Sequence, residues 1–449
     1  MRLIVGISGI RGQIGQTLFP ATAVDAGAAW ASHLGGGAVV IGRDSRPSGA
    51  MLVDAAAAGL AACGCDVIDL GVVSTPGVSM MIRQLGAAGG MVVTASHNPA
   101  GWNGIKMLTA EGWAPPPEPA AQVIERFQGR RFEFAPDEQI GSRSANDQTH
   151  EQHVAAVLAR LDVAAIRRRR IKVVLDSVNG AGGIGGRMLL ERLGCEVVHI
   201  NAEPTGRFAH PPEPIAEHLD QLLDAVRQHG AAVGFAQDPD ADRLVVADEA
   251  GRFLGEEYTL ALVVKHVLGR QAEPVACNLS TSRMIDDVAA AAGVAVHRTP
   301  VGEANVAKAM IDHHCVIGGE GNGGVIDPEV VPVRDSFTGM GYLLEMLAAD
   351  GRPISAIAAG VPRYAMNKQK VACAPDRIAA ALEAVKRAFA DAPLNDADGV
   401  RIDWPEGWVH VRPSNTEPIM RIIAEARDAP AAEALIAKVR EVVDAVMGQ

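Results

Sequence analysis

The sequence is poor in aromatic residues and cysteines and has no long apolar run. It also carries too few positive charges to favour nucleic acid as a partner. Phe, Trp and Tyr make up only 4% of the 449 residues, so aliphatic side chains must fill the cores. No apolar stretch approaches the roughly 20 residues of a membrane-spanning helix. The first six residues, Met1-Arg2-Leu3-Ile4-Val5-Gly6, lack the apolar region of a signal peptide. We therefore expect a soluble cytoplasmic protein with no membrane partner.

The net charge of −12 disfavours nucleic acid as a partner, because its phosphates would repel the chain. A small phosphorylated substrate remains compatible, since Arg and Lys can gather in one site. The basic run at residues 167–170 precedes a strand-like stretch, and we interpret it as a solvated helix or loop end.

The six cysteines do not form a convincing disulfide or metal pattern. Only Cys63 and Cys65 lie close together, and a C-x-C pair alone is a poor indicator of either. Most of the six lie in or beside apolar segments. The sequence therefore predicts buried, reduced thiols, which suits a reducing compartment.

The pattern strand, turn, helix recurs along most of the chain. Residues 38–42 read as a buried strand, 49–63 as a helix, and 90–94 as a strand that runs into a polar loop. The alternation restarts near residues 171 and 258, with a glycine-rich turn predicted at 180–186. This organisation indicates α/β layers with largely parallel strands, and the length alone favours about three domains.

The last segment has a different pattern. Two amphipathic helices, at 377–390 and 431–447, flank three short alternating strands, which predicts a smaller α+β domain. Polar or turn-rich stretches mark the expected boundaries. The predicted domains are residues 1–148, 149–250, 251–362 and 363–449. The three restarts are compatible with a duplicated unit, although no residue-by-residue repeat is visible.

Ser96 lies in the loop Thr94-Ala95-Ser96-His97-Asn98-Pro99, which follows one of these strands. A serine hydroxyl can carry a phosphoryl group if a metal neutralises the phosphate and a nearby group handles the proton. His97 or Lys106 can take the proton-handling part. Taken alone, the same residues also fit an ordinary polar turn.

Three aspartates alternate in Asp238-Pro239-Asp240-Ala241-Asp242-Arg243, directly after an apolar strand. Crowded carboxylates can converge on Mg²⁺, which prefers oxygen ligands. A calcium loop of the EF-hand type is excluded, because Arg243 occupies the turn position of its glycine and a strand follows. A solvated acidic turn is the weaker alternative.

Two further loops have the composition of binding sites. In Gly318-Gly319-Glu320-Gly321-Asn322-Gly323-Gly324, Glu320 and Asn322 can bond sugar hydroxyls, although a plain hairpin turn fits equally well. The loop Arg412-Pro413-Ser414-Asn415-Thr416-Glu417-Pro418 suits a phosphate, with Arg421 as a second cation, and an ordinary polar loop is the alternative. Arg11, in Gly9-Ile10-Arg11-Gly12, can likewise face a phosphate.

Together these loops resemble the α-D-phosphohexomutase family. The match runs in the right order through five segments: 6–12, 94–106, 238–243, 319–324 and 412–418. The resemblance implies four domains around a central cleft, three similar α/β domains with mixed sheets and a smaller C-terminal α+β domain. It further implies an isomerase with one Mg²⁺ ion, a phosphosugar substrate and a sugar bisphosphate activator, working as a monomer or homodimer.

The resemblance also implies a role for each site residue. Ser96 would carry the phosphate and, with Asp238, Asp240 and Asp242, bind Mg²⁺. Arg243 would support the phosphoserine, and Lys106, His97 and Arg11 would form the catalytic group around it. The implied substrate-binding residues are Glu320, Asn322, Arg412, Ser414, Asn415, Thr416 and Arg421.

The sugar loop, Glu320-Gly321-Asn322-Gly323-Gly324, departs from the Glu-Gln-Ser-Gly-His and Glu-Met-Ser-Gly-His forms of two family branches. It is similar to a phosphoglucosamine mutase-like branch, so glucosamine phosphate is the first expected substrate. A phosphomannomutase/phosphoglucomutase is the alternative. A metal-dependent sugar phosphatase and a non-catalytic sugar-phosphate sensor are the remaining alternatives.

Overall fold

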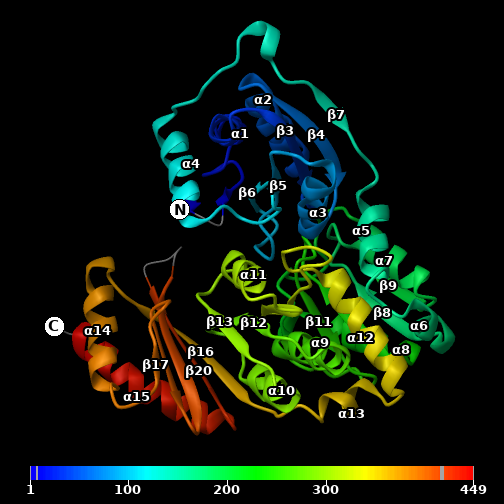
Figure 1. Ribbon diagram of the computed structural model, residues 1–449, viewed down its shortest axis with the longest axis vertical. Coiled ribbons are helices and arrows are strands. Elements are labelled where there is room, and N and C mark those ends of the chain that lie inside the picture. Colours follow the sequence, from blue (N-terminus) through cyan, green and yellow to red (C-terminus); the bar gives the residue numbers. More distant parts are fainter. Residues whose placement is uncertain (1, 7–8, 415–418, 448–449) are drawn as a thin grey trace.

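The computed structural model describes residues 2–6, 9–414 and 419–447, which form four sheets flanked by helices (Figure 1). The first sheet has seven strands in the order β1-β2-β6-β5-β3-β4-β7. Its strands are β1 (Ile4–Gly6), β2 (Gly9–Gln13), β3 (Gly37–Arg43), β4 (Cys65–Val72), β5 (Gly89–Val93), β6 (Trp102–Thr109) and β7 (Arg143–Ala145). Its helices are α1 (Pro20–Leu34), α2 (Gly49–Ala62), α3 (Thr75–Leu85) and α4 (Pro117–Gly129).

The second and third sheets have four strands each, in the orders β11-β10-β8-β9 and β13-β12-β14-β15. The second contains β8 (Lys172–Asp176), β9 (Glu196–Ile200), β10 (Val233–Gln237) and β11 (Leu244–Ala247), with α5 (Thr149–Leu158), α6 (Val163–Arg169), α7 (Gly183–Arg192) and α8 (Asp220–His229). The third contains β12 (Val275–Asn278), β13 (Val296–Thr299), β14 (Ile317–Glu320) and β15 (Gly324–Ile326), with α9 (Glu256–Arg270), α10 (Met284–Ala292), α11 (Glu303–Asp312), α12 (Ser336–Asp350) and α13 (Ile354–Ala358).

The three sheets share one four-stranded core. In each, a central strand (β5, β10 or β14) has a parallel neighbour on one side and an antiparallel neighbour on the other. The parallel neighbour is followed by a further parallel strand, β4, β9 or β13. This confirms three similar α/β domains with mixed sheets. The prediction of largely parallel strands is wrong for the antiparallel neighbours β6, β11 and β15 and, in the first sheet, also for β1 and β2.

Both faces of the first sheet are buried, which explains the continuous apolar run at residues 38–42. Val39 and Ile41 pack with α1 and α2, whereas Val40 packs on the other face with α3 residues such as Val78 and Ile82. The hydrophobic cluster that contains Val40 continues through the second and third domains, so one core connects the three α/β domains.

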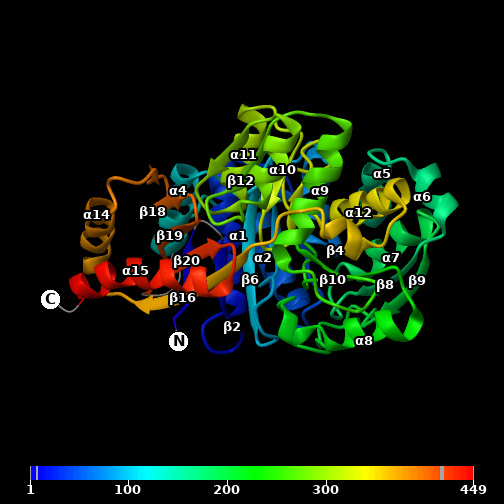
Figure 2. The same ribbon diagram turned by 90° about the horizontal axis from the view of Figure 1, so that it is seen from below.

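The C-terminal domain is a five-stranded antiparallel sheet in the order β16-β20-β19-β18-β17, with α14 and α15 packed on it. Its elements are β16 (Ala365–Ala372), β17 (Leu394–Asn395), β18 (Val400–Trp404), β19 (Gly407–Pro413), β20 (Ile419–Ala426), α14 (Ile378–Ala388) and α15 (Ala429–Met447). It has its own hydrophobic core. Figures 1 and 2 both place it at one end of the molecule, away from α6. The predicted α+β domain is confirmed.

One element prediction is wrong. Residues 180–186 do not form a turn throughout, because α7 begins at Gly183. Its glycines serve close packing: a Cβ at Gly185 would lie only 2.5 Å from the ring of Phe337 at the start of α12. Such contacts between sequence-distant helices leave no local signal.

Three expectations from composition can be compared with the structure. The six cysteines are free thiols, and all except Cys195 are buried, as expected. The basic run at 167–170 is exposed at the end of α6, also as expected. Among the described residues, no helix combines the length and apolarity needed to cross a bilayer.

Candidate active site

Ser96 lies in the loop after β5, and its backbone is in the left-handed region with φ = 49°. Such a conformation is strained for a residue with a Cβ and recurs at functional sites. The side chain is buried, its Oγ donates to Asp238 Oδ2 at 2.9 Å, and His97 Nδ1 lies 3.3 Å from the same Oγ. The serine of the first domain thus contacts the acidic loop of the second.

A buried arginine holds this loop in place. Arg46 Nη2 donates to the carbonyl oxygens of Ser96 and Asn98 at 2.7 and 2.6 Å, and Nη1 donates to those of Pro99 and Trp102. Its charge is balanced by Asp44, whose Oδ2 accepts from Arg46 Nε at 3.0 Å. Neither residue is among the site residues predicted from the sequence. The sequence signal that could have identified this pair is two opposite charges directly after a buried strand.

Replacing Arg46 with methionine is therefore expected to lower both thermal stability and turnover. The change frees four loop carbonyls and leaves the buried Asp44 unpaired, a loss of about 3–5 kcal/mol for such pairs. A calorimetric melt and a steady-state assay would measure the two effects. Arg83→Lys, at an exposed position of α3, is the control. An unchanged melting temperature and turnover in Arg46→Met would contradict this assignment.

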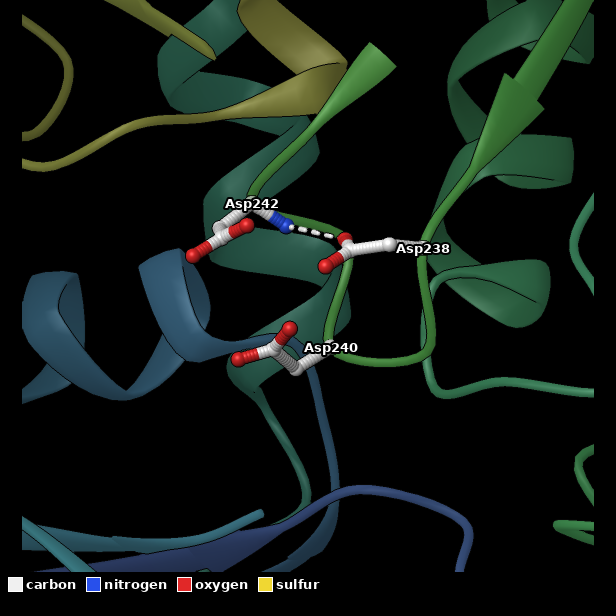
Figure 3. A group of neighbouring side chains, drawn as sticks. All are labelled: Asp238, Asp240 and Asp242. Carbon is white, nitrogen blue, oxygen red and sulfur yellow. Dashed lines mark hydrogen bonds between the residues drawn. The ribbon is translucent and has the colours of Figure 1, made fainter. Parts of the chain in front are cut away.

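The three aspartates follow β10, and their carboxylates point toward a common centre (Figure 3). One oxygen from each lies within 4.8 Å of the others, and all three residues are buried. Asp238 also shapes the turn, because its Oδ1 accepts from the backbone N–H groups of Asp242 and Arg243 at 3.1 and 3.2 Å. The loop is therefore a preformed cluster of acidic oxygens.

The electrostatics of this cluster fit a bound cation. Burial raises the pKa of Asp238 well above its usual range, and the neighbouring carboxylates add to this effect. Asp240 Oδ1 and Asp242 Oδ1 are buried and accept no hydrogen bond within the described part of the chain. Buried carboxylate oxygens without donors are costly unless a cation compensates them. The acidic cluster therefore has the ligand type and the unsatisfied oxygens that Mg²⁺ requires.

Lys106, on β6, lies at the edge of the cluster. Its Nζ is 2.7 Å from Asp240 Oδ2 and 3.8 Å from Asp242 Oδ2. Burial alone would lower the pKa of Lys106, but Asp240 and Asp242 raise it above its ordinary value. The same lysine holds the pKa of Asp240 below its usual range, against the effect of burial. Lys106 is therefore a charged donor to the acidic cluster that Ser96 also contacts.

Two arginines and His97 complete this part of the site. In the described part of the chain, Arg243 Nε is buried without a hydrogen-bond acceptor and lies 3.8 Å from Asp242 Oδ1. Burial lowers the pKa of Arg11, and Arg243 adds to the shift, which places the two cations near each other. Burial and these arginines also lower the pKa of His97 to about 2, so its imidazole is neutral. An anion such as a phosphoserine would satisfy this positive environment.

The sugar-loop candidates lie at the corresponding strand of the third domain. β14 and β15 form a hairpin in which Glu320 pairs with Gly324, which confirms the hairpin interpretation; sugar binding by this loop stays a prediction. Asn322 Oδ1 is buried without a donor among the described residues, and the carbonyl of Gly323 accepts from Leu244 N at 2.9 Å. This last bond ties the sugar loop to the strand that follows the aspartates.

The phosphate-loop candidates lie at the end of β19 and on β20. Arg412 and Arg421 are paired directly across these strands. Arg412 Nε donates to Asp398 Oδ2 at 2.9 Å, and Val301 N donates to the same oxygen at 3.0 Å. The next residue, Gly302, donates through its backbone N–H to Glu320 of the sugar loop. Ser414 N donates to Ile419 O. Asn415 and Thr416 lie outside the described residues.

The structure therefore brings Ser96, His97, Lys106 and the three aspartates together, with Arg11 and Arg243 beside them. Glu320 is connected to this group through Arg334, a residue that the sequence analysis did not single out. Arg334 Nη2 is 2.6 Å from Asp242 Oδ2, and Nη1 is 2.7 Å from Glu320 Oε2. Arg412 belongs to a separate cluster on the C-terminal domain.

The whole chain matches the four domain descriptions of one family. These are phosphoglucomutase/phosphomannomutase alpha/beta/alpha domain I at residues 2–134, domain II at 151–251, domain III at 256–364 and the C-terminal domain at 366–442. The chain belongs to the α-D-phosphohexomutase family. As a phosphohexomutase it is an enzyme of the isomerase class.

Two relatives show how far the likeness extends. The phosphoglucomutase/phosphomannomutase of Thermococcus kodakarensis is 39% identical over 435 residues, covering 95% of each chain. A probable phosphoglucosamine mutase of Methanopyrus kandleri is 37% identical over 425 residues, covering 94% of this chain and 93% of its own. The two carry different substrate names at almost the same identity, so these comparisons do not fix the sugar.

The fold comparison agrees. A phosphoglucomutase/phosphomannomutase family protein from Burkholderia thailandensis superposes with a TM-score of 0.86 at 27% identity, covering 99% of this chain and 98% of its own. A more distant N-acetylphosphoglucosamine mutase from Aspergillus fumigatus, solved with GlcNAc-6P and magnesium, gives 0.61 at 16% identity, covering 99% of this chain and 96% of its own. The latter shows likeness of fold alone.

Proposed function

We propose that this phosphohexomutase interconverts glucosamine 6-phosphate and glucosamine 1-phosphate through a phosphorylated Ser96 and a bisphosphorylated sugar. The observation that carries the proposal is the contact between Ser96 Oγ and Asp238 at 2.9 Å, inside a group of buried carboxylates and arginines. A nucleophilic hydroxyl, a cation site and positive groups beside it are the parts that phosphoryl transfer needs.

Asp238, Asp240, Asp242 and an oxygen of the Ser96 phosphate would hold Mg²⁺. When bound, the ion would neutralise charge on the phosphoryl oxygens during transfer. Arg243 would face the remaining oxygens, since its Nε is buried and donates to no other described residue, and Arg11 would face them from beside Arg243. These cations keep the phosphate oriented while its bond to Ser96 Oγ breaks.

The transfer must also move one proton in each direction. A sugar hydroxyl loses its proton as its oxygen bonds the phosphorus, and Ser96 Oγ leaves as the phosphorus bond breaks. In the return step the second phosphate passes to Ser96. His97 Nδ1 lies 3.3 Å from Ser96 Oγ and Lys106 Nζ lies 2.7 Å from Asp240 of the acidic cluster, so these are the two candidates for passing the proton. We assign these two side chains to proton transfer, since Asp238, the titratable group that accepts directly from Ser96 Oγ, is a proposed metal ligand.

The distal phosphate would be bound by Arg412, Ser414, Asn415, Thr416 and Arg421. Their loop belongs to a domain with its own core, so closure over the substrate can exclude water from the phosphoserine. Exclusion of water distinguishes a mutase from a phosphatase that uses the same groups.

The assignment of an amino sugar is supported by the sugar loop and by the names of several relatives. Glu320 and Asn322 would bond the sugar hydroxyls, and Glu303 and Glu257 lie behind the loop. Probable phosphoglucosamine mutases of Methanopyrus kandleri and Methanothermobacter thermautotrophicus are 37% and 34% identical.

Turnover should be compared on glucosamine, glucose and mannose phosphates, with magnesium and the matching sugar bisphosphate as activator. We expect the highest kcat/KM with glucosamine phosphate. A clear preference for mannose or glucose phosphate would instead support the phosphomannomutase/phosphoglucomutase alternative. Release of inorganic phosphate faster than isomer formation would support a phosphatase.

A further inference from the structure

Arg334 connects the two loops that hold the candidate metal and sugar ligands. It lies between β15 and α12, and 11% of its side-chain surface is exposed. Its three guanidinium nitrogens reach three carboxylates: Nη2 to Asp242 at 2.6 Å, Nη1 to Glu320 at 2.7 Å and Nε to Glu303 at 3.0 Å. The backbone N–H of Arg334 also donates to Glu303 at 2.9 Å.

A glycine makes room for this side chain. A Cβ at Gly324 would lie 2.1 Å from Arg334 Cδ and 2.7 Å from its Cγ, which no real contact allows. Gly324 is not among the glycines with a positive φ, so its backbone does not require glycine. The reason for glycine at this position is therefore the space that the arginine stem occupies. Residue 324 is also the position where the other two loop forms carry histidine.

We propose that Arg334 is a positioning residue that, in the space left by Gly324, holds Glu320 of the sugar loop and Asp242 of the metal loop in one rigid unit. In this chain the stem of Arg334 fills the place that a side chain at residue 324 would take. The inference rests on the proposed function of these two loops as sugar and metal sites.

The geometry explains why an arginine is needed. The guanidinium is a planar fork with fixed donor directions, so it can hold three carboxylates at once. A lysine ammonium is a single point charge and cannot reproduce this arrangement. Without the guanidinium, Asp242, Glu303 and Glu320 would repel one another. The metal ligand Asp242 and the sugar ligand Glu320 would then no longer be held in fixed positions relative to each other.

The first test measures binding without turnover. Mn²⁺, as a magnetic probe for Mg²⁺, should bind Arg334→Met and Arg334→Lys about ten- to a hundredfold more weakly than the unchanged protein, as for other residues that orient metal ligands. The KM for the phosphosugar should rise in the same variants, because Glu320 loses its orientation. Circular dichroism and a thermal melt would show whether each variant is folded.

The second test uses the glycine. Gly324→Ala should weaken Mn²⁺ binding and raise KM in the same way, because its methyl group displaces Arg334. Gly269→Ala is the matched control, since Gly269 is exposed in α9 with no atom near its Cβ position. The double variant Gly324→Ala/Arg334→Ala should be no worse than Arg334→Ala alone, because an alanine at residue 334 has no Cγ or Cδ for the methyl group to displace.

Wild-type Mn²⁺ affinity and KM in Gly324→Ala or in Arg334→Lys would overturn the inference, as would additive losses in the double variant. Failure of the proposed function gives a different result. In that case the unchanged protein itself would not interconvert phosphosugars, whatever the effect of the variants on Mn²⁺ binding.

Discussion

Ser96→Ala is expected to abolish interconversion of the 6- and 1-phosphosugars, with a loss of kcat on the order of 10⁴-fold or more. Alanine has no oxygen to carry the phosphoryl group, so the bisphosphorylated sugar cannot form. Phosphosugar binding should persist, since the proposed sugar and distal-phosphate ligands lie on other domains. A coupled assay of isomer formation and calorimetric titration with the phosphosugar would measure the two properties.

Ser79→Ala is the matched control for this variant. Ser79 is a buried serine of the same domain, and its Oγ donates to Gly112 O at 2.6 Å, in contacts separate from those of Ser96. We expect it to keep most of its turnover. Full activity of Ser96→Ala would remove the serine from the reaction, and loss of phosphosugar binding would show that the change acts on structure.

Asp238→Asn should produce the second-largest loss. The change removes a negative ligand from the acidic cluster and weakens the acceptor of the Ser96 hydroxyl and of two backbone N–H groups. Because a catalytic metal supplies several kcal/mol, we expect turnover to fall about a thousandfold. Metal titrations, followed by both turnover and Mn²⁺ binding, would separate weaker affinity from a lower maximal rate.

Asp248→Asn provides the comparison for Asp238→Asn. Asp248 is also buried in the second domain and also shapes a turn, accepting from Ala250 N and Arg252 N, but it is no member of the acidic cluster. Equal metal affinity in the two variants would refute the assignment of Asp238 as a ligand.

Removal of divalent ions by a chelator should stop turnover of the unchanged enzyme, and added Mg²⁺ should restore it.

The loops that carry chemistry could be found in the sequence because each places a short polar motif at or directly after an apolar strand. Ser96 follows β5, Asp238 follows β10, and Glu320 ends β14, and these strands occupy one position in three equivalent sheets. Carboxyl ends of strands in α/β folds are where ligands bind. The repeat itself was not visible in the sequence, because different side chains fill similar positions.

The residues that hold these loops could not be found in the same way. Arg46 acts on backbone carbonyls about 50 positions away, and Arg334 contacts Asp242 across 92 positions. Neither belongs to a motif, and a charged residue between two elements is usually exposed. Burial and shared partners identify them, Arg46 in the folded first domain and Arg334 only when the second and third domains are placed together.

The most direct test of the central claim follows a labelled phosphoryl group on Ser96. The enzyme would be labelled with a radioactive sugar bisphosphate, the labelled peptide identified, and the phosphoenzyme mixed with unlabelled glucosamine 6-phosphate for a single turnover. We predict that the label is on Ser96 and passes to the sugar as a bisphosphate, with little release of inorganic phosphate. Label on another residue, or label released mainly as inorganic phosphate, would contradict the proposed mutase mechanism.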